Sequence, residues 1–119
     1  MSVTIYHNPR CSKSRETLNL LEERSIEPDV VEYLKAPPDA ATLGDLLEML
    51  GLEPRDLMRK KEAEYKELNL ANPDLTRDQL IAAMVSHPRL IERPIVVTGG
   101  KAALGRPPES VLDILNGDR

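Results

Sequence analysis

The chain has 119 residues, a net charge of −4, one cysteine and three tyrosines, and it contains neither tryptophan nor phenylalanine. This length predicts one domain, 1–119, with an aliphatic core, and the acidic balance argues against a nucleic-acid or membrane-surface partner. A single cysteine excludes an internal disulfide and a multi-cysteine zinc site, and no apolar run is long enough for a membrane span.

The first third of the chain predicts a βαβ unit. Residues 2–6 alternate and are rich in β-formers, which indicates a short strand. Pro9 has no N–H and breaks this pattern, and a helix is expected from Ser12 to Arg24. A second strand is expected from Asp29 to Tyr33. The N-terminus lacks the basic start and apolar stretch of a signal peptide, so we expect a cytoplasmic protein.

The middle of the chain shows helical signals alone. Thr42 is expected to cap a helix that ends at Gly51, since leucines recur between them at i, i+3, i+4 and i+7. Pro54 is expected to begin a short helical piece that runs through Lys61. Thr76 begins a capping-box sequence, Thr-Arg-Asp-Gln, in front of another helix. Residues 40–90 are therefore predicted to be helical, without strands.

The last third predicts a hairpin and a helix. Residues 94–98 and 101–104 are strand-like, and Gly99-Gly100 between them favours a tight turn. Pro107-Pro108 is expected to open the final helix. The order β-α-β, helices, β-β-α predicts an α/β fold with a thioredoxin-like core and an all-helical insertion at about 38–91.

Cys11 is the main candidate for chemistry. It lies between the first strand and the first helix, where free backbone N–H groups and the helix dipole favour a negative charge. Arg10, Lys13 and Arg15 surround it in the sequence, and His7 could add a positive charge or a proton. These features favour a reactive thiolate over the alternative, a small buried hydrophobic residue.

The residues around Cys11 narrow the type of site. Backbone amides of the turn, with the hydroxyls of Ser12 and Ser14, can bind a tetrahedral oxyanion. Arg15 stands at the wrong offset for the Cys-x5-Arg loop of cysteine phosphatases. Ser14 stands where a dithiol oxidoreductase would have its second cysteine. The remaining interpretation is a monothiol site that needs an external thiol for redox chemistry.

Four segments together resemble the glutaredoxin-dependent arsenate reductase family. Residues 7–15 read His-Asn-Pro-Arg-Cys-Ser-Lys-Ser-Arg, which is similar to the family motif His-Asn-Pro-x-Cys-x-x-Ser-Arg. Residues 57–61, Leu-Met-Arg-Lys-Lys, resemble its first arginine segment. Residues 92–97 resemble its Arg-Pro-Ile-Val-Val segment, and residues 105–107, Gly-Arg-Pro, its last arginine. The resemblance extends from residue 3 to about 115.

This resemblance implies a nucleophilic cysteine, two residues that help hold it as thiolate, three arginines around the oxyanion and a cis-proline. In that order, they are Cys11; His7 and Ser14; Arg59, Arg93 and Arg106; and Pro94. Arsenate would be reduced to arsenite, with glutathione as co-substrate and glutaredoxin as the partner that removes the glutathionyl group. No bound cofactor is implied, and no cluster of ligand-type residues predicts a metal site.

Two other functions fit parts of the pattern. Related thioredoxin-like proteins with the same helical insertion regulate transcription by binding RNA polymerase, but they do not need the full set of arginines. A glutathione-dependent thiol reductase would need Cys11 and would be indifferent to the arginines. Taken by itself, Arg59 with its two following lysines also fits an ordinary basic surface patch.

Overall fold

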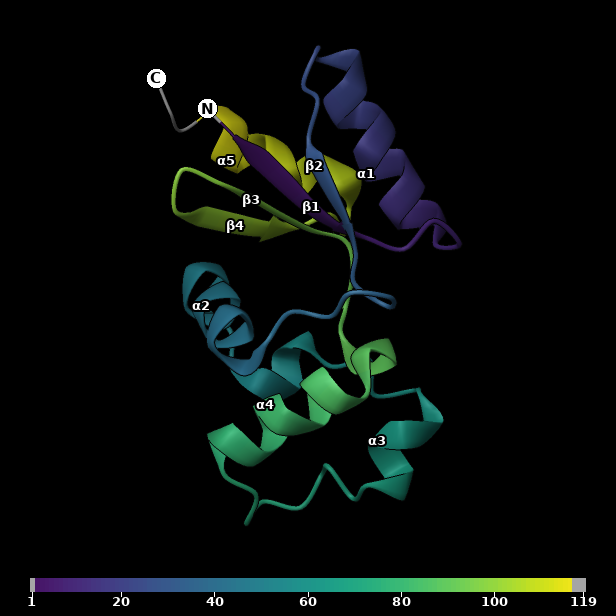
Figure 1. Ribbon diagram of the computed structural model, residues 1–119, viewed down its shortest axis with the longest axis vertical. Helices are drawn as coiled ribbons and strands as arrows, with labels where there is room; N and C mark the ends of the chain where they lie inside the picture. Colours follow the sequence, from purple (N-terminus) through teal and green to yellow (C-terminus); the bar gives the residue numbers. More distant parts are fainter. Residues whose placement is uncertain (1, 117–119) are drawn as a thin grey trace. The chain divides into compact units, whose positions relative to one another are not determined.

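Strands from the first and the last third of the chain form a four-stranded mixed sheet (Figure 1). The strands are β1 (Val3–His7), β2 (Asp29–Glu32), β3 (Ile95–Thr98) and β4 (Lys101–Leu104), arranged in the order β2-β1-β3-β4. β1 runs parallel to β2 and antiparallel to β3, and β3 runs antiparallel to β4. This topology is a thioredoxin-like core, as the sequence predicted, with an all-helical segment between its halves.

The computed structural model describes residues 2–116 and divides into two compact units. The sheet unit contains the described residues up to Ala36 and those from Arg93 onward, and the helical unit is Pro37–Glu92. No helix within the described range is long and apolar enough to cross a membrane. Each unit is described below by itself.

An aliphatic cluster joins the sheet to its flanking helices in the sheet unit. Alternate residues of β1 are buried, which explains the alternating sequence of this strand. They pack with Leu21 of α1 (Ser12–Glu23) and with residues of η3 (Pro108–Val111) and α5 (Leu112–Asn116). The buried members of the cluster are Val3, Ile5, Leu21, Val96, Val111 and Ile114. Burial of each such side chain contributes about 1.5–3 kcal/mol, so this cluster fixes α1 on the sheet.

The hairpin between β3 and β4 turns at two glycines. Gly99 and Gly100 have φ angles of 58° and 75°, in the left-handed region that side chains with a Cβ disfavour. Two consecutive residues with positive φ are typical of a type I′ turn, which matches the twist of the flanking strands. The hairpin and its turn are therefore confirmed.

The helical unit contains α2 (Ala40–Leu50), η1 (Pro54–Leu57), α3 (Ala63–Glu67), α4 (Arg77–Ser86) and η2 (Pro88–Leu90). The capping box at Thr76 and the left-handed Gly51 at the end of α2 are confirmed. The predicted cap at Thr42 is wrong, because the Asp39 side chain accepts a hydrogen bond from the Thr42 backbone N–H. Thr42 thus lies within the first turn of α2.

One strand-like contact interrupts the helical unit. Met58 and Ile91 form an isolated antiparallel bridge, and the Arg59 N–H donates to the carbonyl oxygen of Leu90 at 2.7 Å. The predicted helical piece from Pro54 therefore ends at Leu57 rather than Lys61, since the next residues are extended. The sequence analysis also missed α3.

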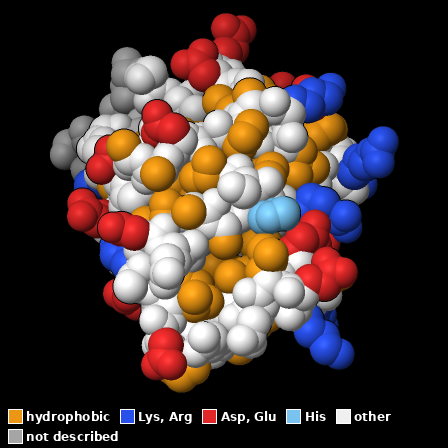
Figure 2. All heavy atoms as spheres, turned by 60° about the horizontal axis from the view of Figure 1, so that its bottom comes forward, with side chains coloured by type: hydrophobic (Ala, Val, Ile, Leu, Met, Phe, Trp, Pro, Cys, Tyr) orange, Lys and Arg blue, Asp and Glu red, His pale blue; other side chains and the backbone are white. Residues whose placement is uncertain are grey.

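Hydrophobic side chains gather on the face of the molecule that Figure 2 shows. A groove of about 310 Å³ lies between α4 and the loop that joins α3 to α4. Its apolar lining includes Leu68, Leu70 and Leu75, and His87 stands at its border.

Candidate active site

Cys11 lies where the chain passes from β1 into α1. The Cys11 N–H donates to the carbonyl oxygen of Asn8 at 3.0 Å, which closes the turn after β1. Its own carbonyl accepts the first helical hydrogen bond, from the Arg15 N–H at 3.0 Å. Cys11 is therefore the N-cap of α1 and is 7% exposed. This position directs the free backbone N–H groups of the first helical turn toward the sulfur.

Several groups act on the pKa of Cys11, in opposite directions. Burial raises the pKa of the thiol, whereas the backbone N–H of Ser14, the charge of Arg93, the backbone N–H of Lys13 and the charge of Arg106 lower it. The lowering effects outweigh burial, and the pKa of Cys11 lies below its ordinary value. More of this sulfur is therefore ionised at neutral pH than in a free cysteine, and the thiolate is the nucleophilic form.

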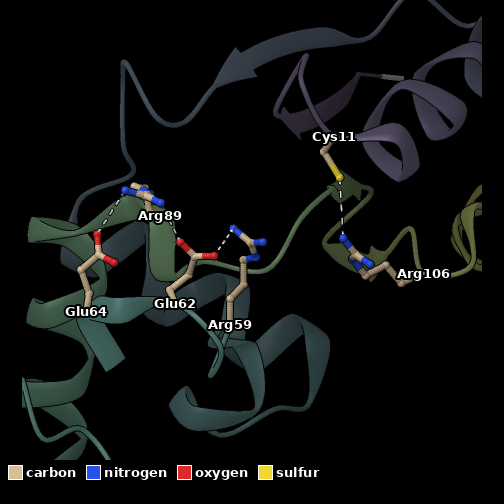
Figure 3. Close-up of polar contacts among 6 residues, drawn as sticks. All are labelled: Cys11, Arg59, Glu62, Glu64, Arg89 and Arg106. Atoms are coloured by element: carbon tan, nitrogen blue, oxygen red, sulfur yellow. Dashed lines mark hydrogen bonds and ion pairs between the residues drawn. The ribbon is translucent and has the colours of Figure 1, made fainter. Parts of the chain in front are cut away.

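Arg106 contacts the sulfur directly. Its Nη2 donates to the Cys11 Sγ at 3.6 Å (Figure 3), and its Nε donates to the backbone carbonyl of Arg93 at 2.8 Å. The second contact orients the guanidinium, because one end of the planar group is bound to the backbone while the other faces the sulfur. Arg93 and Arg106 flank the β3–β4 hairpin, so the hairpin brings both cations toward Cys11.

The sequence suggested that the positive side chains next to Cys11 favour its thiolate, but the side chains of Lys13 and Arg15 make other contacts. The Lys13 ammonium lies 3.7 Å from Glu16 on the exposed face of α1. The Arg15 Nη1 donates to the carbonyl oxygen of Pro9 at 2.9 Å and so braces the turn. Lys13 acts on the sulfur through its backbone N–H, and the side-chain charges that act on the sulfur come from Arg93 and Arg106.

His7 and Ser14 form a buried pair beside this turn. The His7 Nδ1 and the Ser14 Oγ are 2.6 Å apart, and the same oxygen accepts a hydrogen bond from the Asn8 N–H at 3.0 Å. Burial lowers the pKa of His7, the nearby Glu32 carboxylate raises it, and Arg15 lowers it further, with a net decrease. The Nδ1 of a neutral imidazole pairs with the Ser14 hydroxyl as donor or as acceptor, according to its tautomer. The pair therefore holds the turn in place.

The proline before β3 lies at the same site. Pro94 is buried, and the Arg93–Pro94 peptide bond is cis, as is the Arg106–Pro107 bond. The carbonyl oxygen of Pro94 accepts a hydrogen bond from the Gly105 N–H at 2.9 Å. A Cβ on Gly105 would overlap the Thr17 hydroxyl and would lie 2.7 Å from the Pro94 ring. The sequence analysis did not identify Gly105 as a site residue, although it directly precedes Arg106.

Arg59 belongs to the helical unit. Its Nη1 lies 3.1 Å from a carboxylate oxygen of Glu62, and the other Glu62 oxygen accepts from the Arg89 Nη2 at 3.0 Å (Figure 3). Glu62 and Arg89 had not been singled out in the sequence. The i, i+3 spacing of Arg59 and Glu62 was the available signal.

Within residues 2–116, no three His, Cys, Asp or Glu side chains lie close enough together to hold a metal ion.

A cavity of about 370 Å³ adjoins the turn before Cys11. Its lining includes His7, Arg10 and Lys35, so polar and charged groups face it.

Known proteins resemble this chain over nearly its full length. The model of the ArsC family matches residues 6–114. The uncharacterised protein YfgD of Escherichia coli K12 is 65% identical over 114 residues, which cover 95% of this chain and 96% of that protein. An arsenate reductase of Neisseria meningitidis serogroup A is 54% identical over 114 residues, which cover 95% and 97%. A solved structure of an arsenate reductase from Vibrio cholerae has a TM-score of 0.93 and 59% identity, and the match covers 96% and 98% of the two chains.

Proposed function

This chain belongs to the ArsC family, and we propose that it is an oxidoreductase that reduces arsenate to arsenite. The observation that carries the proposal is the Cys11 sulfur at the start of α1, with a lowered pKa and the Arg106 guanidinium at 3.6 Å. A nucleophile beside two cations suits a substrate that is an anion. Relatives that are named arsenate reductases and are more than half identical support the same reaction.

The first step would be attack of the Cys11 thiolate on arsenic. A sulfur–arsenic bond forms, and one arsenic–oxygen bond breaks as that oxygen takes up protons and leaves as water. Arg59, Arg93 and Arg106 would bind the remaining oxygens, since a guanidinium fork can donate two hydrogen bonds to one oxyanion. Donors held in place before the reaction stabilise the charge that develops on these oxygens.

The second step needs a thiol from outside the chain, because Cys11 is the single cysteine in the sequence. Glutathione thiolate would attack the Cys11 sulfur, and the sulfur–arsenic bond would break with its electron pair left on arsenic. As(V) becomes As(III), and the two thiols become a mixed disulfide. Glutaredoxin would then remove the glutathionyl group by thiol–disulfide exchange in a reducing cytoplasm.

The supporting residues have positioning roles in this scheme. His7 and Ser14 would hold the turn that presents Cys11, through the contact between Nδ1 and Oγ at 2.6 Å. Pro94 would form the wall of the site between Arg93 and β3. Neither role requires these side chains to exchange protons with the substrate.

The test is an assay for arsenite with the purified chain, arsenate, glutathione and glutaredoxin. We expect multiple turnovers that stop when glutathione is omitted and are absent in Cys11→Ser. Arg93→Ala and Arg106→Ala should fold normally and lose most of the arsenate activity.

A thiol reductase would give a different result. It would reduce a glutathione mixed disulfide equally well with or without the two arginines, and it would produce no arsenite. That outcome would overturn the proposed function.

A further inference from the structure

Glu62 is the centre of a compact ion cluster in the helical unit. Its two carboxylate oxygens contact different arginines, the Arg59 Nη1 at 3.1 Å and the Arg89 Nη2 at 3.0 Å. The Glu62 side chain is 15% exposed and that of Arg59 is 28% exposed. Ion pairs that are shielded from water are stronger than exposed ones, so this pair restricts both side chains.

The local backbone brings Arg59 and Glu62 together. Arg59 is fixed by its N–H, which donates to the carbonyl oxygen of Leu90 at 2.7 Å. The Glu62 N–H donates to the Arg59 carbonyl at 3.1 Å, so a turn places side chains i and i+3 on the same side. Arg89 approaches from η2 and holds the second carboxylate oxygen. The carboxylate is thus held from two directions before any substrate binds.

The contact leaves most of the Arg59 guanidinium available. In the described part of the chain, Glu62 is the one carboxylate that pairs with Arg59, and the contact at 3.1 Å is made through Nη1. A guanidinium carries five N–H donors in a rigid fork, so donors on Nη2 and Nε remain for an anion. Glu62 also pairs with Arg89, so its single negative charge is shared between two arginines. The positive charge of Arg59 is therefore only partly neutralised.

We propose that Glu62 is a positioning residue that holds the Arg59 guanidinium in the orientation in which it binds the oxyanion. The inference rests on the proposed function for the identity of the anion and for the role of Arg59 in its binding. An arginine side chain that is already ordered loses less conformational entropy when the anion binds. Glu62 therefore increases the affinity for arsenate, although it is itself an anion.

The experiment compares Glu62→Gln with Glu64→Gln. Glutamine keeps the size of the side chain and removes its charge. Glu64 is a matched control, because its carboxylate lies 3.9 Å from Arg89 and makes no ion pair with Arg59. The readout is the arsenate concentration that halves the rate of Cys11 alkylation by iodoacetamide, together with kcat and KM for arsenate. Circular dichroism on heating confirms that each variant is folded.

We expect Glu62→Gln to raise the half-protecting arsenate concentration and KM about fivefold, equivalent to about 1 kcal/mol, with kcat changed less than twofold. Glu64→Gln should match the wild type. In an Arg59→Ala background, Glu62→Gln should cause no further change, because it acts through Arg59.

Three results would overturn the inference. The first is an arsenate concentration for half-protection that is unchanged or lower in Glu62→Gln. The second is an increase caused by Glu62→Gln that persists in the Arg59→Ala background. The third is an Arg59→Ala variant in which arsenate protects Cys11 as well as in the wild type. Protection does not need turnover. A wild-type chain that is protected by arsenate but forms no arsenite would refute the proposed function and still test Glu62.

Discussion

Ser14→Ala removes a hydroxyl that joins two groups of the turn before Cys11. Ser14 is fully buried, its Oγ lies 2.6 Å from the His7 Nδ1, and it accepts from the Asn8 N–H at 3.0 Å. A buried polar group left without its partner costs about 1–3 kcal/mol. Asn8 is half-buried, so water can replace part of its lost hydrogen bond. The sum for the two groups is a loss of about 2–3 kcal/mol in the free energy of unfolding.

Urea denaturation followed by circular dichroism measures this loss. Ser12→Ala is the matched control, since Ser12 is exposed and lies on the same turn of α1. Exposed substitutions of this kind change stability by less than about 0.5 kcal/mol. A Ser14→Ala variant as stable as Ser12→Ala would refute the reasoning, because the hydrogen bonds of the Ser14 hydroxyl would then contribute nothing to stability.

Four further predictions concern the site. The alkylation rate of Cys11 should rise with pH through a midpoint below about 8.5, the value of a free cysteine, and a midpoint at or above that value would contradict the lowered pKa. Because the pKa of Cys11 is lowered in the folded state, its ionisation adds stability that is complete above about pH 8.5 and is lost as the pH falls through the folded-state pKa. The difference in the free energy of unfolding between the wild type and Cys11→Ser should therefore increase as the pH rises. Arg106→Lys should lower kcat/KM for arsenate about fivefold, since one ammonium cannot donate both to the sulfur and to the Arg93 carbonyl in the same fork; kinetics equal to those of the wild type would mean that charge alone suffices. Gly105→Ala should destabilise the chain by about 1–3 kcal/mol through overpacking against Thr17 and Pro94, which thermal unfolding would show, and an unchanged melting temperature would contradict it.

Local signals in the sequence were enough to place Cys11 in the fold. The strand before Pro9 and the helix from Ser12 fixed Cys11 at a strand-to-helix junction, and the structure has it as the N-cap of α1. The same kind of signal located the Gly99-Gly100 turn and the Thr76 capping box. Each depends on a few adjacent residues whose conformational preferences agree.

The charges around the thiol could not be found in this way. Sequence distance pointed to Arg10, Lys13 and Arg15, whereas the side chains that act on the sulfur are Arg93 and Arg106. These are more than 80 positions away and approach Cys11 because β3 pairs with β1. The resemblance to a family pointed to both arginines, which residue patterns alone did not connect with Cys11.

The errors in the helical unit have physical causes as well. Asp39 and Thr42 both have side chains that can cap a helix, and the leucine periodicity does not say where the first turn begins. The bridge between Met58 and Ile91 is a single residue pair, so it leaves no alternating pattern in the sequence. Glu62 was overlooked because its second partner, Arg89, comes from a distant segment.

The most direct test of the account is the intact mass of the chain after incubation with arsenate and glutathione, with glutaredoxin left out. We expect one glutathione per chain, located on Cys11 by peptide mapping, and no such adduct when arsenate is omitted or in Cys11→Ser. Addition of glutaredoxin should then return the mass to that of the free thiol. Sustained production of arsenite by a chain that never carries glutathione, or turnover without any added thiol, would contradict the proposed mechanism.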